Sequence, residues 1–337
     1  MNPRSLIYPM LSAAAALYTL APSFALAQAV PAAAKVATAA SAQSKGVPRT
    51  ADGHPDLSGI WSSATVVPFE RPKDLGSKEF FTPEEAEAYR KKALAASKEV
   101  VAPGTYGDVH YNMAQFGLEK SQARVASSIR TSIVVGPEGR IPPMLPEAVE
   151  RNNAIATANK GHEFDSAQNR PLGEQCLMWP GEGPPMLPQG YNSNLQIVQS
   201  GGKVAVMLEM IHDTRIIPTD NSPHLPSNIR QWFGDSRGHW EGDTLVVDTT
   251  NFTNRTAFRG SSENLHVVER FTRTADDQIL YQFTVDDPHT WAKPWGGEFT
   301  LTKIDGPIFE YACHEGNYGM RNNLSGARAE EKAKAGK

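Results

Sequence analysis

From residue 193 onward, short runs of alternating hydrophobic and polar residues are separated by turn residues. A period of two is typical of half-buried strands. Runs flanking Gly201-Gly202, residues 241–243 and residues 275–278 predict three hairpins, and residues 295–316 predict a fourth that turns at Asp305-Gly306. Sequential antiparallel strands form a meander. Eight to ten of them close into a barrel, which removes exposed sheet edges, so the pattern predicts a mainly β fold.

The chain before residue 193 has a mixed pattern. Residues 82–99 predict a helix, because Thr82 as N-cap, Pro83 and Glu85 form a capping box. Residues 147–160 predict a second helix, and residues 127–144 predict one strand before a Gly-Pro-rich turn. A strand is also expected at Gly59-Ile60-Trp61, whereas residues 168–192, with five prolines, predict a long irregular loop.

The first residues have the pattern of an export leader. Arg4 precedes an apolar run at residues 6–24, and Ala25-Leu26-Ala27 has the small-x-small form of a cleavage site. We therefore expect a signal peptide at 1–27, a linker at 28–46, and a periplasmic or secreted protein; the alternative is an uncleaved anchor. No later run is long enough for stable membrane insertion.

Three further segments follow the linker in the predicted organisation. Residues 47–192 hold the first strand or strands, the helices and the proline-rich loop, residues 193–320 form the barrel core, and residues 321–337 are a short polar helix or a frayed tail. The formal net charge of −4 gives no basis for nucleic-acid binding, which needs a clustered basic face. The oligomeric state stays open.

The chain has two cysteines, Cys176 and Cys313. In an oxidising compartment, two cysteines without a competitor are expected to form one disulfide. The alternatives are a nucleophilic Cys313 activated by His314, or a metal ligand beside His314 and Glu315. Adjacent side chains on a strand point to opposite faces, which argues against a Cys313–His314 dyad.

Isolated charges on otherwise apolar strand faces predict a lined cavity, and the alternative is that these charges lie at the solvated rim. The cavity would bind a small apolar or aromatic molecule, with Arg215 as an anchor for a carboxylate or phenolate. A structural ion pair of Arg215 with Glu209 or an aspartate and a structural aromatic core are the competing interpretations. The residues predicted to contact the ligand are Glu209, Arg215, Trp240, Tyr281, Phe283, Trp291 and Trp295.

Acid–base chemistry is the second functional hypothesis. His212, His314 and Asp287 supply titratable groups for a lyase, isomerase or hydrolase that needs no cofactor. A metal bound by histidine and carboxylate, or a non-covalent haem with His212 or His314 as axial ligand, is an alternative. The sequence has no HExxH, CxxC or CxxCH motif, so no cofactor is favoured.

Two resemblances add to this pattern. "PDLSGIW" at 55–61 resembles the opening strand of the calycin superfamily, the barrel group of lipocalins and fatty-acid-binding proteins. The combination of "PDLSGIW", "EMIHDTRIIP", "GHWEGDTLVVDTTNF" and "YACHEGN" resembles a family of secreted bacterial proteins over most of residues 47–328. The resemblance implies a calycin-like barrel and an exported protein, and it transfers no activity or residue role. A structural envelope protein is therefore the third hypothesis.

Overall fold

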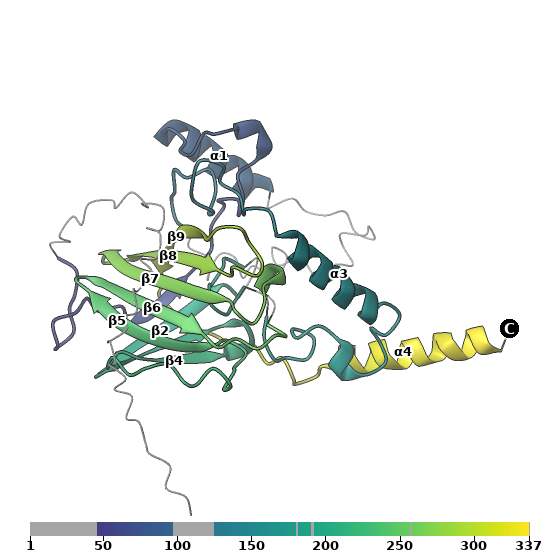
Figure 1. Ribbon diagram of the computed structural model, residues 1–337. Helices are drawn as coiled ribbons and strands as arrows, with labels where there is room; N and C mark the ends of the chain where they lie inside the picture. Colours follow the sequence, from purple (N-terminus) through teal and green to yellow (C-terminus); the bar gives the residue numbers. More distant parts are fainter. Residues whose placement is uncertain (1–45, 97–124, 180, 190–191, 257, 337) are drawn as a thin grey trace, which may run out of the picture. The chain divides into compact units, whose positions relative to one another are not determined.

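The computed structural model describes residues 46–96, 125–179, 181–189, 192–256 and 258–336, which belong to a compact unit at residues 41–337. The expected leader at 1–27 and nearly all of the linker lie outside the described residues. Nine antiparallel strands form one sheet (Figure 1). They are β1 (Gly59–Ser62), β2 (Asn194–Ser200), β3 (Lys203–Leu208), β4 (Thr214–Pro218), β5 (Asp235–Glu241), β6 (Thr244–Thr250), β7 (His266–Ala275), β8 (Gln278–Asp286) and β9 (Trp295–Lys303).

The sheet curls into a nearly closed barrel. Its hydrogen-bonded order is β4-β3-β2-β1-β9-β8-β7-β6-β5, so β4 and β5 are the two ends of the order. These ends meet through side chains: a Cβ on Gly238 of β5 would lie 3.0 Å from methyl groups of Ile217 and Thr219. Glycine permits this close approach of the two strands. The predicted antiparallel meander of eight to ten strands is confirmed.

Residues 219–234 join β4 to β5 and are fastened to the outer face of the barrel. The two ring nitrogens of His224 lie 2.9 Å from Asp235 and 3.0 Å from Asp248. Asp248 also lies 2.7 Å from Nε2 of His266, whose pKa is raised by this hydrogen bond. The loop after β4 is thus tied to β5 and β6 by charge-assisted contacts.

The inward faces of the strands form one hydrophobic core. Trp61 of β1 is fully buried, and its indole N–H donates to the carbonyl of Leu57 at 2.9 Å. The Tyr281 ring lies 5.0 Å from the ring centroids of both Phe271 and Phe299. Inward residues that we expected to line a cavity, Tyr281 and Phe283 among them, therefore pack against other core side chains.

Two strand predictions are wrong. The run at 203–218 is interrupted by a 3₁₀ turn, η4 (Met210–His212), so β3 and β4 are separate strands and alternation does not extend through 209–213. The predicted fourth hairpin does not form, since the chain has no strand at residues 304–317 after β9. One edge of β9 pairs with β8. The other pairs with β1 at Thr302 and Lys303 and, at residues 296–298, with residues 133–135, which leaves a returning strand no free edge there.

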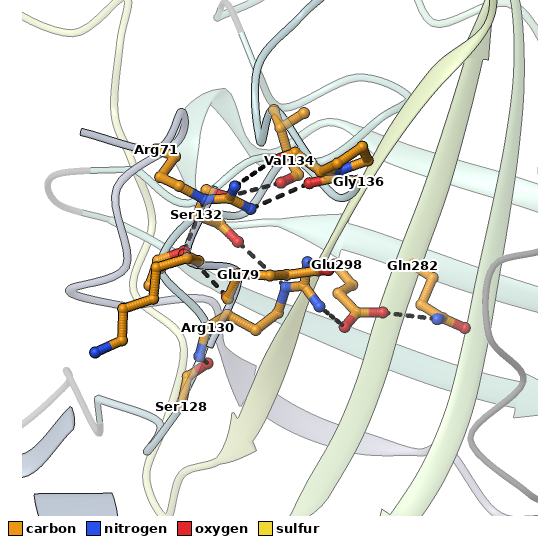
Figure 2. A network of polar contacts seen from close by, with 12 residues as sticks. Arg71, Glu79, Ser128, Arg130, Ser132, Val134, Gly136, Gln282 and Glu298 are labelled. Atoms are coloured by element: carbon orange, nitrogen blue, oxygen red, sulfur yellow. Dashed lines mark hydrogen bonds and ion pairs between the residues drawn. The ribbon is translucent and has the colours of Figure 1, made fainter. Parts of the chain in front are cut away.

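The segment at 127–144 also differs from its prediction. It makes isolated bridges, Phe80 with Arg130 and Val134 with Gly297, and no regular strand. Figure 2 shows how it is held: Arg130 donates to Glu79 at 3.1 Å and to Glu298 of β9 at 2.9 Å. Backbone hydrogen bonds also join Ile133 and Val135 to β9, and the side chains of Ile133 and Val134 are buried in the core. The segment therefore lies along the edge of β9.

Among the described residues, three α-helices lie outside the sheet: α1 (Pro83–Ala96), α3 (Pro146–Asn159) and α4 (Tyr318–Ala335). The predicted capping box is confirmed, because Glu85 N–H donates to Thr82 Oγ1 at 3.3 Å and Thr82 N–H donates to Glu85 at 2.8 Å. α4 occupies the predicted polar tail. The part of the chain that the structure describes also has short 3₁₀ turns, η1 (Lys73–Leu75), η3 (Ala167–Asn169), η4 (Met210–His212) and η5 (Phe258–Gly260). In the described part of the chain, no helix is long and apolar enough to cross a membrane.

The two cysteines form the expected disulfide. The sulfurs of Cys176 and Cys313 lie 1.97 Å apart and their Cα atoms 5.8 Å apart. The bond links the proline-rich loop to the segment after β9 across 137 residues of sequence. Cys313 is therefore a structural residue and is not available as a nucleophile or metal ligand.

Candidate functional site

Buried polar side chains gather at the barrel end where β2 begins and β3 ends. Asn194, the first residue of β2, and Glu209, the residue after β3, are 3% and 1% exposed. The Asn194 amide donates to Glu209 Oε2 at 2.8 Å, and the Glu209 N–H donates to the Asn194 carbonyl at 2.9 Å. Strand pairing thus holds an amide and a carboxylate together away from water.

Residues 181–189 of the proline-rich loop cover this end. The Met186 N–H donates to the Tyr281 hydroxyl at 2.8 Å, which ties the loop to the core. The loop carries Glu182, which is 4% exposed. Burial, with the negative charges of Asp213 and Glu209, raises the pKa of Glu182 from 4.5 to about 9. Glu182 is therefore a neutral carboxylic acid at pH 7.

We call Glu182, Asn194, Glu209, His212 and Asp213 the strand-end cluster. Many of its buried polar atoms have no hydrogen-bond partner among the described residues. They are Glu182 Oε2, Asn194 Oδ1, Glu209 Oε1 and His212 Nδ1, and Arg215 Nε joins them. Because native proteins pair most buried polar groups, such a concentration marks a place where another molecule can supply partners.

A cleft of about 270 Å³ adjoins the cluster. Glu209 and His212 belong to both. Glu310 adds a carboxylate, whose Oε1 lies 3.7 Å from His212 Nε2. The full lining is Met207, Leu208, Glu209, His212, Ile308, Phe309 and Glu310. The cleft therefore combines mostly apolar walls with a few polar groups, the usual composition of a small-molecule site.

The turn between Glu209 and Asp213 has strained backbone. Ile211 has φ of 61° and His212 has φ of 46°. A β-branched residue rarely adopts positive φ, because its side chain crowds the backbone at a cost of about 1–2 kcal/mol. Backbone strain of this kind gathers at functional sites, and here it borders the cleft.

A second buried group lies deeper in the barrel. Arg215 of β4 donates to both carboxylate oxygens of Glu269, at 2.7 and 3.0 Å, and the Tyr281 hydroxyl donates to Glu269 at 2.7 Å. Burial, together with the Glu269 charge, raises the pKa of Tyr281. The expected alternative of a structural ion pair holds for Arg215, with Glu269 and not Glu209 as the partner. The charge of Arg215 is thus already neutralised, by a residue, Glu269, that was not among those predicted from the sequence.

The predicted aromatic residues lie in different places. Trp240 stacks on His54 at a centroid distance of 4.5 Å, near the β5–β6 turn at the opposite barrel end. Trp291 and Trp295 pack edge to face at 5.6 Å, and Trp295 also meets Phe283 at 6.0 Å. Of the residues predicted to contact the ligand, Glu209 is the one that lines the cleft.

The three predicted catalytic residues are not brought together. His212 lies in the cleft, whereas His314 lines a separate hollow of about 380 Å³ beside the disulfide. Asp287 accepts hydrogen bonds from the Ser262 N–H and hydroxyl, the His289 N–H and the Thr290 hydroxyl, at 2.6–3.0 Å. Through these four hydrogen bonds Asp287 stabilises the turn after β8.

Comparisons with known proteins give no family assignment. No family model matches the chain, and no curated protein matches it. A solved structure of a mutant of the fluorescent protein UnaG aligns with 14% identity and a TM-score of 0.22, over 40% of this chain and 86% of that one. A TM-score this low supports no inference about function. In the described residues, no group of three histidine, cysteine or acidic side chains has the geometry to hold a metal ion.

Proposed function

We propose that this protein binds a small molecule in the cleft beside the strand-end cluster. The observation that carries the proposal is the set of buried, unpartnered polar atoms on Glu182, Asn194 and Glu209 next to an open cleft. Leaving such atoms unpaired costs about 1–3 kcal/mol each, which a ligand that pairs them would recover.

The cleft limits what the ligand can be. Its volume of about 270 Å³ is near the lower end of the roughly 300–1,000 Å³ common for small-molecule sites. Met207, Ile308 and Phe309 give it apolar walls, so the ligand has a compact apolar body. The apolar or aromatic molecule expected from the sequence thus occupies the end of the barrel in this proposal, because core side chains fill the centre.

The proposal places this binding in an exported protein. The leader pattern at 1–27 supports export, and the Cys176–Cys313 disulfide is typical of an oxidising compartment. A periplasmic or secreted binding protein would meet small molecules from the surroundings of the cell.

Filling the cleft tests this function. A ¹⁹F NMR screen of a fluorinated fragment library is expected to give hits that the Met207→Trp variant loses, because the indole occupies the cleft. Val198→Trp is the matched control, since Val198 lies on an exposed face of the neighbouring strand β2. Hits that persist in Met207→Trp, or a library without hits, would contradict the proposal.

Acid–base catalysis in the same cleft is the second candidate. It is favoured by the Glu182 carboxyl, whose pKa is raised to about 9, so that it can donate a proton at neutral pH to a group bound beside Glu209. Catalysis would make Glu182→Gln lose turnover of a cleft ligand while its binding stays. A pure binding protein would show no chemical change of the ligand in wild type either, as followed by NMR of the bound fragment.

A further inference from the structure

The charges around the cleft are mainly of one sign. Glu209 and Glu310 line it, and Asp213 lies close enough to act electrostatically on Glu182. The positive charge nearby, on Arg215, is matched by the two-pronged contact with Glu269. A cleft with carboxylates on its wall, beside a buried arginine that is already neutralised, has a negative potential, which attracts cations and repels anions.

The unpartnered atoms point to the same chemistry. Asn194 Oδ1 and Glu209 Oε1 are hydrogen-bond acceptors on side chains that are more than nine-tenths buried. Glu209 receives one side-chain hydrogen bond, from Asn194, so its second oxygen has no donor among the described residues. A buried carboxylate is stable when a cation or several donors face it. The missing partner is therefore a donor, and a charged one fits best.

We infer that the ligand of this cleft is a small organic cation, an ammonium or guanidinium group on a compact apolar body. This inference rests on the proposed function and specifies its ligand. The charged group is held by Glu209 and Asn194, and Glu310 and His212 border its path. The apolar body lies against Met207 and Phe309.

The arrangement disfavours the other ligand classes. An anion would need a free cationic side chain. The Arg215 guanidinium, which was predicted to anchor a carboxylate or phenolate, already donates to both oxygens of Glu269. A neutral apolar molecule would leave Glu209 Oε1 buried without a donor and would keep that cost. The three classes are therefore expected to bind in the order cation, neutral, anion.

Three probes of matched shape test the inference: phenethylammonium, 2-phenylethanol and 3-phenylpropionate. Each is titrated at pH 7 into full-chain protein with ¹³C-methyl methionine, and the signal of Met207 is followed after its assignment with Met207→Leu. Phenethylammonium is expected to shift this signal with at least tenfold tighter affinity than the alcohol, because a hydrogen bond to a charged group adds about a factor of ten or more. The carboxylate is expected to bind most weakly.

The outcomes separate this inference from the proposed function. Equal or tighter binding of the alcohol or the carboxylate at Met207 would overturn the cation and leave the cleft as a binding site. If none of the probes shifts Met207, and the fragment screen also gives no hit that Met207→Trp removes, both proposals fail. A response to phenethylammonium at Met144, which bridges to Trp291 away from the cleft, without one at Met207 would place the site elsewhere and also overturn the inference.

The second part of the experiment measures probe binding to variants of the cleft carboxylates Glu209 and Glu310. Glu209→Gln is expected to weaken phenethylammonium at least tenfold while 2-phenylethanol is little changed. Glu310→Gln, an exposed position at which folding is not at risk, is expected to weaken it about threefold through the loss of one nearby charge. Glu315→Gln is the control, since Glu315 is exposed in the same segment but does not line the cleft. Unchanged phenethylammonium affinity in both cleft variants would overturn the inference.

Discussion

Two buried polar groups lie near the same end of the barrel, and they differ in how their hydrogen bonds are filled. In the Arg215–Glu269–Tyr281 group, both carboxylate oxygens accept donors at 2.7–3.0 Å and the opposite charges cancel. In the strand-end cluster, Glu182 and Glu209 are as deeply buried, yet each has an oxygen without a partner in the described residues. In the first group Arg215 Nε alone lacks a partner among the described residues, whereas the second group has four such atoms that a further molecule can pair.

The largest effect on the free energy of unfolding is expected from a change in the Arg215–Glu269–Tyr281 group. Glu269→Gln leaves the Arg215 charge buried without its counter-charge, so the free energy of unfolding should fall by about 3–5 kcal/mol. Urea denaturation at pH 7 measures this. Glu241→Gln is the control, because its ion pair with Arg270 at 2.8 Å is exposed and should contribute about 1 kcal/mol or less. Similar losses in both variants would mean that the buried group is not the stabilising one.

In the strand-end cluster a substitution is expected to stabilise the protein, by a smaller amount and only at higher pH. Glu182 ionises near 4.5 when unfolded and near 9 when folded, so between these values the folded state holds the extra proton. The stability of wild type should therefore fall with rising pH, by roughly 1.4 kcal/mol per pH unit from this group. Glu182→Gln removes that slope.

The test compares urea unfolding of Glu182→Gln and wild type at pH 6 and pH 7.5. The variant should gain about 2 kcal/mol relative to wild type over this interval. Glu150→Gln, at an exposed position of α3, should show no such gain. A constant difference between Glu182→Gln and wild type at the two pH values would show that the carboxyl is already ionised in the folded protein.

The smallest of the three effects concerns the link between the two groups. Tyr281→Phe removes a donor to Glu269 and leaves the Met186 N–H without its acceptor. A loss of about 1.5 kcal/mol in the free energy of unfolding is expected, since the ring itself still fills the core. Phe271→Leu, a change of core packing without a polar group, provides the comparison. Faster hydrogen exchange at Met186 should accompany Tyr281→Phe alone.

The barrel could be predicted from the sequence because its strands are local and alternate clearly. The same alternation indicates the one residue of the Arg215–Glu269–Tyr281 group that was not predicted. Glu269 lies between Val267 and Phe271 in the alternating pattern, and both of these point inward and are buried. A lone glutamate on a buried face needs a cation near it. Arg215, which also points inward, from β4, supplies that cation. The expected disulfide followed from the number of cysteines together with the leader pattern at 1–27.

The strand-end cluster could not be predicted, because its parts meet through non-local contacts. Glu182 lies in a proline-rich loop without periodicity, and only the fold of that loop over the barrel end buries it. The cleft wall at Ile308 and Phe309 depends on residues 304–317 not pairing as a strand. That outcome is decided by β1, which occupies the edge of β9 from more than 230 residues earlier in the chain.

The most direct test is one series of urea unfolding curves with and without phenethylammonium at ten times its dissociation constant for wild type. Wild type should gain roughly 1.4 kcal/mol from the probe. Without the probe, Glu209→Gln should match wild type, and with it should gain about 0.4 kcal/mol or less, because its affinity is at least tenfold weaker. Tyr281→Phe should be less stable but keep the full gain. The account would be contradicted if Glu209→Gln lost stability as Tyr281→Phe does and kept the gain from the probe.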